Sequence, residues 1–329
     1  MVYSTNTWYH VEVTNDASST TRRIYVNGVL KNSDANTGIN AGSKLTIGRA
    51  GAYSGLYLKG IVDQIRIYNY ARTPAQVAWD FNRGSPVGWW KFDECQGTTA
   101  NDSSGNGNSG TLTIGATGDE DTVGTCTTSS TAWGSGATGK RNYSLSLDGT
   151  DDYITRADDA DFDFAAADNF TVSAWAKHDG VIFANPDYIL TKADTTTGGY
   201  KLWMDGNGNL CFGVDDDSNW GTIDDYICTS GVDFDDSAWH LVTGVKTGTT
   251  KIELFVDGIS RASDSTISAT NTLANSNALY IGMDRDGTSA GWDGQIDDVR
   301  IYNYALTPVQ VKDVYNNGAV NFAPSSGAP

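Results

Sequence analysis

One group of residues that could do chemistry in this chain consists of aspartates in polar loops. Asp is far commoner than Glu and lies mostly among Gly, Asn, Ser and Thr, as in the runs 284–287 (Asp-Arg-Asp-Gly) and 215–217 (Asp-Asp-Asp). Clustered carboxylate oxygens suit a divalent cation such as calcium. Neither run has the spacing of an EF-hand, which needs a bidentate Glu further on, so a solvated turn is the simpler explanation of each.

Aromatic side chains that a core does not need are the second candidate group. Trp203 alternates with apolar neighbours and should face away from them across a sheet. Trp220 lies in a polar loop with Asp217 and Asn219. Aromatic rings stack on the apolar faces of sugars, while Asp and Asn accept hydrogen bonds from hydroxyl groups. These four residues are the predicted ligand-binding set, and packing in the core or at its rim is the alternative for each Trp.

Four cysteines predict an oxidising compartment. None has the close Cys-x-x-Cys spacing of a metal site, so disulfides are the expected use. Of three possible connectivities the sequence favours Cys95–Cys126 and Cys211–Cys228, because the second pair would join neighbouring strands around an Asp-rich loop. Such bonds persist outside the cytosol. Four buried free thiols are the alternative.

Composition argues against several classes of function. The 22 basic and 40 acidic residues give a net charge of −18, which repels nucleic acid. No window approaches the roughly 18 uninterrupted apolar residues of a membrane span, and the amino end lacks the basic and apolar regions of a signal peptide. We expect no nucleic-acid partner, no membrane insertion and no export signal in the chain as given. Plain solubility is the alternative explanation of the acidity.

The elements that must position these residues are short strands. Apolar residues alternate with polar ones in segments such as 170–175 and 252–256, and Asp-Gly and Asn-Gly turns separate the strands. That rhythm predicts an all-β antiparallel sandwich. Thr73 and Thr307 each open a Thr-Pro-x-Gln sequence, a capping box that predicts a short helix after the last strand of each repeat.

The repeat itself is a tandem duplication. The sequence 65–71 (Ile-Arg-Ile-Tyr-Asn-Tyr-Ala) returns at 299–305 (Val-Arg-Ile-Tyr-Asn-Tyr-Ala), and shorter matches precede both copies in the same order. The second copy follows a long stretch that has no counterpart ahead of the first. We therefore predict the carboxy-terminal half of a domain in residues 1–84, a complete domain in residues 85–320, and a linker in residues 321–329. The chain is expected to be a piece of a longer one.

Several segments, taken in order, resemble the laminin-G-like and pentraxin-like branch of the concanavalin-A-like lectins and glucanases. They are residues 90–94 (Trp-Lys-Phe-Asp-Glu), 102–108, 147–154, 239–242 and 294–303. The resemblance covers residues 88–318 fully and residues 7–84 as a half, and it implies a jelly roll of two curved sheets. Where the family typically has Trp-His-His-Val, each copy here keeps one of the two histidines. A shared metal or catalytic role of that pair is therefore not expected.

The same resemblance implies a calcium ion that holds the amino-terminal loop to the last strand. The matching positions are Asp102 and Asn106 with Asp297 or Asp298. By strand alternation Asp297 shares a face with two apolar residues further along, and a carboxylate on such a face is costly unless a metal or several donors satisfy it. Backbone carbonyls would have to complete a shell of about six to eight oxygens. An Asx-turn loop and a hydrogen-bonded buried Asp are the alternative.

An enzyme is not expected. Glucanases of this fold carry Glu-x-Asp-x-Glu on one strand, so that two carboxylates flank the glycosidic bond. Here residues 119–121 (Asp-Glu-Asp) lie between glycines without strand character, and three histidines offer neither a Ser-His-Asp nor a zinc constellation. The fold alone supplies no chemistry.

The sequence thus predicts a non-catalytic, extracellular adhesion module that binds glycan or matrix, with structural calcium. A structural spacer of a large cell-surface protein, without a ligand of its own, is the first alternative, and a glycoside hydrolase is the second. Half a sandwich would leave apolar strand faces uncovered and strand edges open. We expect residues 1–84 to pack against the complete domain, or against the same segment of a second chain.

Overall fold

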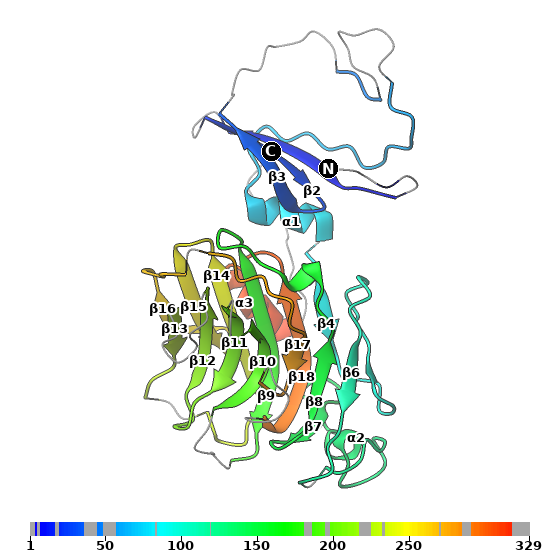
Figure 1. Cartoon of the computed structure of the whole chain (residues 1–329), viewed down its shortest axis with the longest axis vertical. Helices are drawn as coiled ribbons and strands as arrows, with labels where there is room; N and C mark the ends of the chain where they lie inside the picture. Colours follow the sequence, from blue (N-terminus) through cyan, green and yellow to red (C-terminus); the bar gives the residue numbers. More distant parts are fainter. Residues whose placement is uncertain are drawn as a thin grey trace. The chain divides into compact units, whose positions relative to one another are not determined.

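The structure, a computed structural model, divides the chain into two compact units, Met1–Phe81 (unit 1) and Asn82–Pro329 (unit 2) (Figure 1). No helix among the described residues is long and apolar enough to cross a membrane. The structure describes all residues except 1–3, 5, 6, 17–19, 36–44, 49–56, 83, 119, 181–185, 195–197, 217–224, 232, 233, 270, 285–290 and 318–329.

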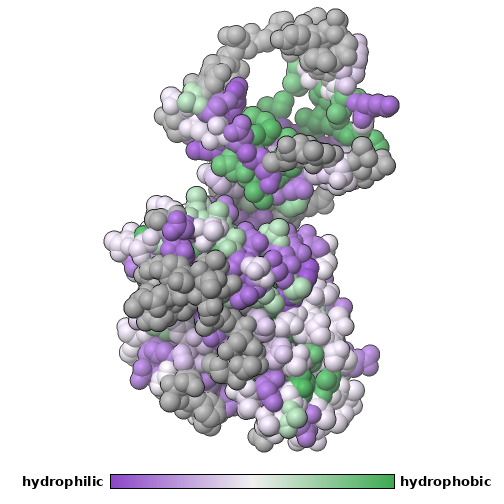
Figure 2. Space-filling view, viewed as in Figure 1, coloured by the Kyte–Doolittle hydropathy of each residue, from purple (hydrophilic) through white to green (hydrophobic). Residues whose placement is uncertain are grey.

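Unit 1 is a small antiparallel sheet with one helix (Figure 1). In order across the sheet its strands are β1 (Val11–Asp16), β2 (Thr21–Val26) and β3 (Val29–Asp34), and its helix is α1 (Pro74–Asn82). One face of the sheet is covered, and Tyr25 on it is buried. The other face carries Val11, Val13 and Ile24, which are all exposed. Figure 2 shows hydrophobic residues gathered on the visible face of unit 1, whereas the visible surface of unit 2 is mostly polar.

Unit 2 is a sandwich of two antiparallel sheets (Figure 1). In order, the eight-stranded sheet has β13 (Asp225–Cys228), β12 (Leu210–Asp215), β11 (Gly198–Met204), β10 (Asp187–Asp194), β17 (Leu279–Ile281), β8 (Tyr153–Arg156), β6 (Gly110–Thr113) and β5 (Thr99–Ala100). The seven-stranded sheet has β16 (Ile259–Asp264), β15 (Lys251–Val256), β14 (His240–Thr247), β9 (Phe170–His178), β18 (Asp293–Tyr302) and β4 (Gly88–Trp90), with β7 (Leu145–Asp148) also paired to β18. The helices are α2 (Ala132–Ser135), the 3-10 turn η1 (Ala160–Phe162) and α3 (Pro308–Asn317).

The core of unit 2 lies between the two sheets, because alternate side chains of every strand point inward. Leu112, Ile154 and Leu202 come from the eight-stranded sheet and Val172 and Ile301 from the seven-stranded one, and all are buried in one cluster. Burying each such aliphatic side chain contributes about 1.5–3 kcal/mol. The predicted all-β jelly-roll sandwich is therefore confirmed.

The two longer helices open as the sequence predicts. At α1 the Thr73 amide donates to Gln76 Oε1 (3.0 Å) and the Gln76 amide donates to Thr73 Oγ1 (3.3 Å). At α3 the same reciprocal bonds join Thr307 and Gln310, at 2.7 and 3.3 Å. Each capping box satisfies two amides that the helix leaves without partners.

Both predicted disulfides form. Cys95 is bonded to Cys126, and Cys211 is bonded to Cys228. The second bond joins directly opposed residues of β12 and β13, as the sequence suggests. Two disulfides are typical of a protein that works in an oxidising, extracytosolic compartment.

Candidate functional site

A groove crosses the outer face of the eight-stranded sheet over β6, β8 and β17. Inward-facing Leu112, Ile154 and Ile281 leave their neighbours on these strands facing out. The groove has a volume of about 550 Å³. Its principal lining residues are Thr111, Thr113, Tyr153, Thr155, Arg156 and Tyr280.

Two tyrosine rings form the apolar part of this groove. The ring centroids of Tyr153 and Tyr280 lie 5.7 Å apart with the planes tilted by 54°. Thr111, Thr155 and Tyr280 stand opposite one another in a row across three strands. Aromatic faces beside a row of hydroxyl groups offer both apolar contact and hydrogen bonds to a polyhydroxylated ligand.

Arg156 supplies the cationic group of the groove, but its charge is balanced. Its Nη2 donates to Asp159 Oδ2 at 2.9 Å and to Asn108 Oδ1 at 3.1 Å. A guanidinium already paired with a carboxylate attracts a second anion weakly. The groove therefore suits an uncharged ligand better than an acidic one.

Of the predicted ligand-binding residues, Trp203 faces outward as alternation requires. Its ring packs between Tyr188 and Tyr226, with centroids 6.3 and 6.1 Å away, and the residue is only 5% exposed. Gly213 on the next strand makes room, because a Cβ there would lie 3.0 Å from the indole. Trp203 thus contributes a packed aromatic cluster to the sheet's outer face. The other three predicted residues, Trp220, Asp217 and Asn219, lie outside the described residues.

Sequence reasoning missed the tyrosines of the groove, although a signal for them exists. In Leu279-Tyr280-Ile281 the flanking residues are buried, so the alternation places Tyr280 outward. The same pattern around Ile154 places Tyr153 outward. What the sequence does not reveal is that β8 and β17 are neighbours, since more than 120 residues separate them.

Among the residues expected to bind calcium, Asp102 has its carboxylate filled by hydrogen bonds. Oδ1 accepts from the amides of Trp89 (3.0 Å) and Ser104 (2.8 Å), and Oδ2 accepts from Ser104 Oγ (2.7 Å) and the Asn108 amide (2.9 Å). Burial alone would raise the pKa of Asp102, but these donors outweigh it and lower the pKa. Asn106 uses its Nδ2 to donate to the Val87 carbonyl at 3.0 Å. This is the Asx-turn arrangement that the sequence left open.

The two carboxylates of β18 differ sharply. Asp298 is paired with Arg300, whose Nη2 lies 2.6 Å and whose Nε lies 3.1 Å from its oxygens, and it accepts from Trp89 Nε1 at 2.5 Å. Asp297 is fully buried; its Oδ2 accepts from the Arg141 amide at 2.6 Å, and its Oδ1 meets no donor among the described residues. Burial, together with the nearby charges of Asp298 and Asp93, raises the pKa of Asp297 to about 8.

The predicted strand face of Asp297 needs correction. Ile296, Val299 and Ile301 all belong to the core, so the two aspartates between Ile296 and Val299 both point outward. The ladder with β9 shifts register between Asp297 and Arg300, at the point where Asp298 adopts a φ of 51°. This bulge inserts one residue and breaks simple alternation.

The charge of Asp93, which raises the pKa of Asp297, lies at the edge of a second cavity. Asp93 accepts from the Tyr143 amide at 3.3 Å, and it lines a cavity of about 390 Å³ with Asn142 and Tyr143. Carboxylate and carbonyl oxygens around such a space are the ligands that calcium prefers. Asp297 with its buried Oδ1 therefore fits a cation, whereas Asp102 and Asp298 offer no oxygen without first losing their present partners.

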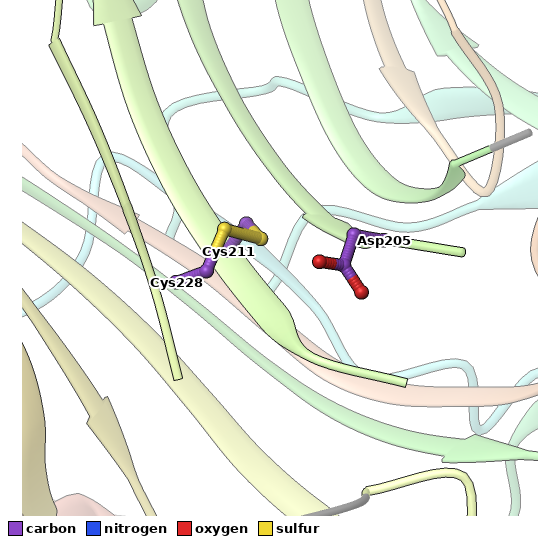
Figure 3. Close-up of side chains that lie close together, drawn as sticks. All are labelled: Asp205, Cys211 and Cys228. Carbon is purple, nitrogen blue, oxygen red and sulfur yellow. A yellow bond between two sulfur atoms is a disulfide. The ribbon is translucent and has the colours of Figure 1, made fainter. Parts of the chain in front are cut away.

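Two further groups of candidate metal ligands have structural roles. Asp205 lies beside Cys211 and Cys228, but both sulfurs are consumed in the disulfide (Figure 3). Asp205 Oδ1 accepts from the amides of Asn207 (2.8 Å) and Asn209 (3.0 Å), which fixes the β11–β12 turn.

The second group is Asp148, Asp151 and Asp152; one carboxylate oxygen of each lies within 4.8 Å of the other two. Burial raises the pKa of Asp152 to about 7. Its Oδ1 accepts from the Gly115 amide at 2.8 Å, so this group ties the loop after β6 to the β7–β8 turn.

Solved structures share this fold at low identity. The binding domain of Paraclostridial Mosquitocidal Protein 1 is 17% identical with a TM-score of 0.53, over 71% of this chain and 52% of that one. The binding domain of Botulinum Neurotoxin serotype G is 15% identical with a TM-score of 0.52, over 70% and 50%. This chain thus spans about half the length of those two domains. Domain 4 of AbnA, an extracellular arabinanase of Geobacillus stearothermophilus in complex with arabinotriose, is 19% identical with a TM-score of 0.50, over 70% and 98%.

A family model also matches the sequence. Residues 2–78 and 148–312 match the laminin G model described as the concanavalin A-like lectin/glucanases superfamily. No curated protein matches the sequence. The family match, the jelly-roll sandwich of unit 2 and the likeness to binding domains agree, and the chain belongs to the laminin G group of the concanavalin A-like lectin/glucanase superfamily.

Proposed function

We propose that this chain is a non-catalytic module that binds an uncharged glycan outside the cell, through the groove over β6, β8 and β17. The observation that carries the proposal is the Tyr153–Tyr280 pair beside a row of threonine hydroxyls in one open groove. Sugars present apolar ring faces and many hydroxyl groups, and this lining complements both. The balanced charge of Arg156 favours a neutral ligand.

Two further observations support a binding role. Domain 4 of AbnA, which has this fold over nearly its whole length, is described in complex with arabinotriose. The disulfides fit a secreted protein or the cell-surface part of a larger one, where glycans are the abundant ligands.

The test is a glycan array probed with the whole chain in calcium-containing buffer, followed by titration of the best neutral ligand. Replacing either groove tyrosine, as Tyr153→Ala or Tyr280→Ala, should weaken binding about tenfold, because a stacked ring is worth about 0.5–1.5 kcal/mol beyond the area that it buries. Tyr226→Ala removes an exposed ring from the same sheet outside the groove and should leave the affinity unchanged.

Two results would contradict binding in this groove. If Tyr226→Ala weakens binding and Tyr153→Ala does not, the ligand occupies the aromatic cluster around Trp203. If no glycan binds to the intact chain, the binding proposal is wrong and the structural-spacer alternative gains.

We also propose that unit 2 holds a structural calcium ion at Asp297, with Asp93 as a further ligand. The support is the buried Oδ1 of Asp297, which meets no donor among the described residues, and the nearby charge of Asp93. The charge of Arg141 offsets the raised pKa of Asp297 only in part, and a divalent cation would supply further positive charge beside the two carboxylates. Asp102 and Asn106, the loop ligands that the family resemblance implies, remain predicted ligands.

Chelation tests the ion. A site filled to about 100 times its dissociation constant stabilises the folded state by about 2.7 kcal/mol, so excess chelator should lower the thermal midpoint of unit 2. Asp297→Asn should abolish the response to chelator. Asp102→Asn should leave the response intact if Asp102 only caps its loop, and should abolish it if Asp102 is a ligand. An unchanged midpoint of the intact chain in chelator would end the proposal.

A further inference from the structure

Unit 1 repeats the backbone of the carboxy-terminal half of unit 2 in detail. The β2–β3 ladder shifts register between Ile24 and Tyr25, and the β15–β16 ladder shifts at the matching position, between Leu254 and Phe255. The hairpin turns that follow place Asn27 and Asp257 at φ values of 52° and 55°. Residues other than Gly rarely adopt such values, so their recurrence marks one shared local fold.

The bulge of the last strand is repeated as well. Gln64 has a φ of 48° where Asp298 of β18 has 51°. Yet residues 58–68 form no strand, whereas their counterpart β18 lies between β9 on one side and β4 and β7 on the other. Among the described residues of unit 1, no strand pairs with this segment, although it keeps the bulge of the central strand.

The missing layer shows in the exposure of matching residues. Ile65 and Ile67 are 50% and 72% exposed, while Val299 and Ile301 at the same positions of unit 2 are fully buried. Val11 of β1 is also exposed, while its counterpart in β14 lies in the core. In unit 2 the neighbour of both β14 and β18 is β9. By this correspondence, a β9-like strand in unit 1 would lie between β1 and residues 58–68.

The charge of unit 1 also favours a partner that resembles the amino-terminal part of unit 2. Unit 1 has eight basic and five acidic residues, in a chain whose net charge is −18. Residues 85–236, which supply β9 and most of the eight-stranded sheet in unit 2, have seven basic and 26 acidic residues. A half-sandwich of that composition is electrostatically complementary to unit 1.

We propose that unit 1 is an acceptor for a β-strand with the pattern of β9, brought by a polypeptide that carries the amino-terminal half of the same fold. The strand adds between β1 and residues 58–68, and backbone hydrogen bonds to both edges supply the affinity. Alternate apolar side chains supply the register. In unit 2 Val172 of β9 stands opposite Gly244 and Ile301. The matching residue of the added strand is thus expected between Val13 and Ile67.

The probe is a synthetic peptide with the sequence of residues 169–179, made soluble by aspartates at both ends so that its charge complements unit 1, and it is added to the intact chain. Binding should slow amide hydrogen exchange in residues 11–16 and 58–68. Val13→Asp or Ile65→Asp in the chain should weaken peptide binding at least tenfold. Val29→Asp, an exposed apolar position on the far strand of the same sheet, should not change it. The peptide carrying Val172→Asp should not bind.

Two results would overturn the proposal. One is the absence of peptide binding, or binding that protects amides of unit 2 instead. The other is self-association of the chain that protects residues 11–16 and 58–68 and that the peptide does not reverse, because the occupant would then be a second copy of unit 1.

Discussion

The segments 65–71 and 299–305 are nearly identical in sequence, yet the second begins in a buried central strand, whereas the first is paired with no strand in the described part of the chain. What the two units share around these segments is local: the hairpin turn, the bulge and the helix cap. The two units differ in strand pairing and in the burial of apolar side chains, and both of these depend on neighbouring strands. Local sequence specifies how the backbone bends, but only a second layer turns an apolar extended segment into a strand of a sandwich.

One difference between the copies lies inside the shared half. In unit 2, Leu306 and Val314 are buried near helix α3. Unit 1 has Arg72 and Asp80 at these positions, with Arg72 Nη2 at 2.6 Å and Nε at 2.9 Å from Asp80 Oδ2. Their side chains are only 9% and 3% exposed. Matching positions of the two units thus hold a buried ion pair in unit 1 and buried apolar side chains in unit 2.

The largest expected effect breaks this pair. Asp80→Val leaves the Arg72 charge buried without its carboxylate, which should lower the free energy of unfolding of unit 1 by about 3–5 kcal/mol. This change in the free energy of unfolding is measured by urea unfolding, monitored by amide hydrogen exchange in β2 and β3. The double variant Arg72→Leu with Asp80→Val copies unit 2 and should be neutral or stabilising. A double variant as unstable as the single one would show that the two packings are not equivalent.

Matched deletions of apolar side chains come next. Ile301→Ala removes a fully buried side chain and should cost about 2–5 kcal/mol. Ile67→Ala, at the equivalent position, removes an exposed one and should change the stability of unit 1 by about 0.5 kcal/mol or less. Comparable losses at the two sites in denaturant titrations would mean that unit 1 already buries this face in solution.

The two units should also respond to pH in opposite directions. In unit 2, burial alone would lower the pKa of His178, but its bonds to Asp187 Oδ2 (3.0 Å) and Asp235 Oδ1 (2.8 Å) outweigh burial and raise the pKa. Burial raises the pKa of Asp187 as well; the hydrogen bond with His178 opposes this rise, and the nearby charge of Asp235 adds to it. Asp293 carries a charge that couples to the same imidazole.

A raised histidine pKa contributes stability that is full below about pH 6.5 and is lost as the pH rises through the folded-state value. His178→Gln should therefore destabilise unit 2 most at acidic pH, by about 1.5–3 kcal/mol for its charged hydrogen bonds, and less at alkaline pH. In unit 1, burial lowers the pKa of His10, so its contribution falls as the pH drops below about 6.5. Thermal midpoints of the intact chain, His178→Gln and His10→Gln between pH 5 and 9 test both signs.

The smallest effect concerns what the copies share. Thr73→Ala and Thr307→Ala each remove one capping bond and should each cost about 1 kcal/mol. Equal losses, measured by hydrogen exchange in the two helices, would confirm that the local half of the design is the same in both units. A loss at only one helix would show that tertiary packing, and not the cap, holds that helix.

The sequence predicts the local features of the molecule better than the features that depend on contacts between distant segments. The capping boxes at Thr73 and Thr307, the strand pairing behind Cys211–Cys228 and the sandwich of unit 2 depend on patterns within a few residues or on spacing along the chain, and they are confirmed. The outward face of Asp297 was missed, because the bulge at Asp298 depends on how β18 meets β9. The tyrosine groove was missed because it is made by strands far apart in the sequence.

The Cys211–Cys228 bond has a mechanical consequence. β13 is the outermost strand of its sheet, and its backbone ladder among the described residues is with β12. When an antiparallel edge strand is pulled away from its neighbour, its backbone hydrogen bonds break one pair at a time, and each pair resists only weakly. The disulfide at Cys228, the last residue of β13, prevents separation at that end, so a pulling force on unit 2 would be carried past this edge as shear across the sheet.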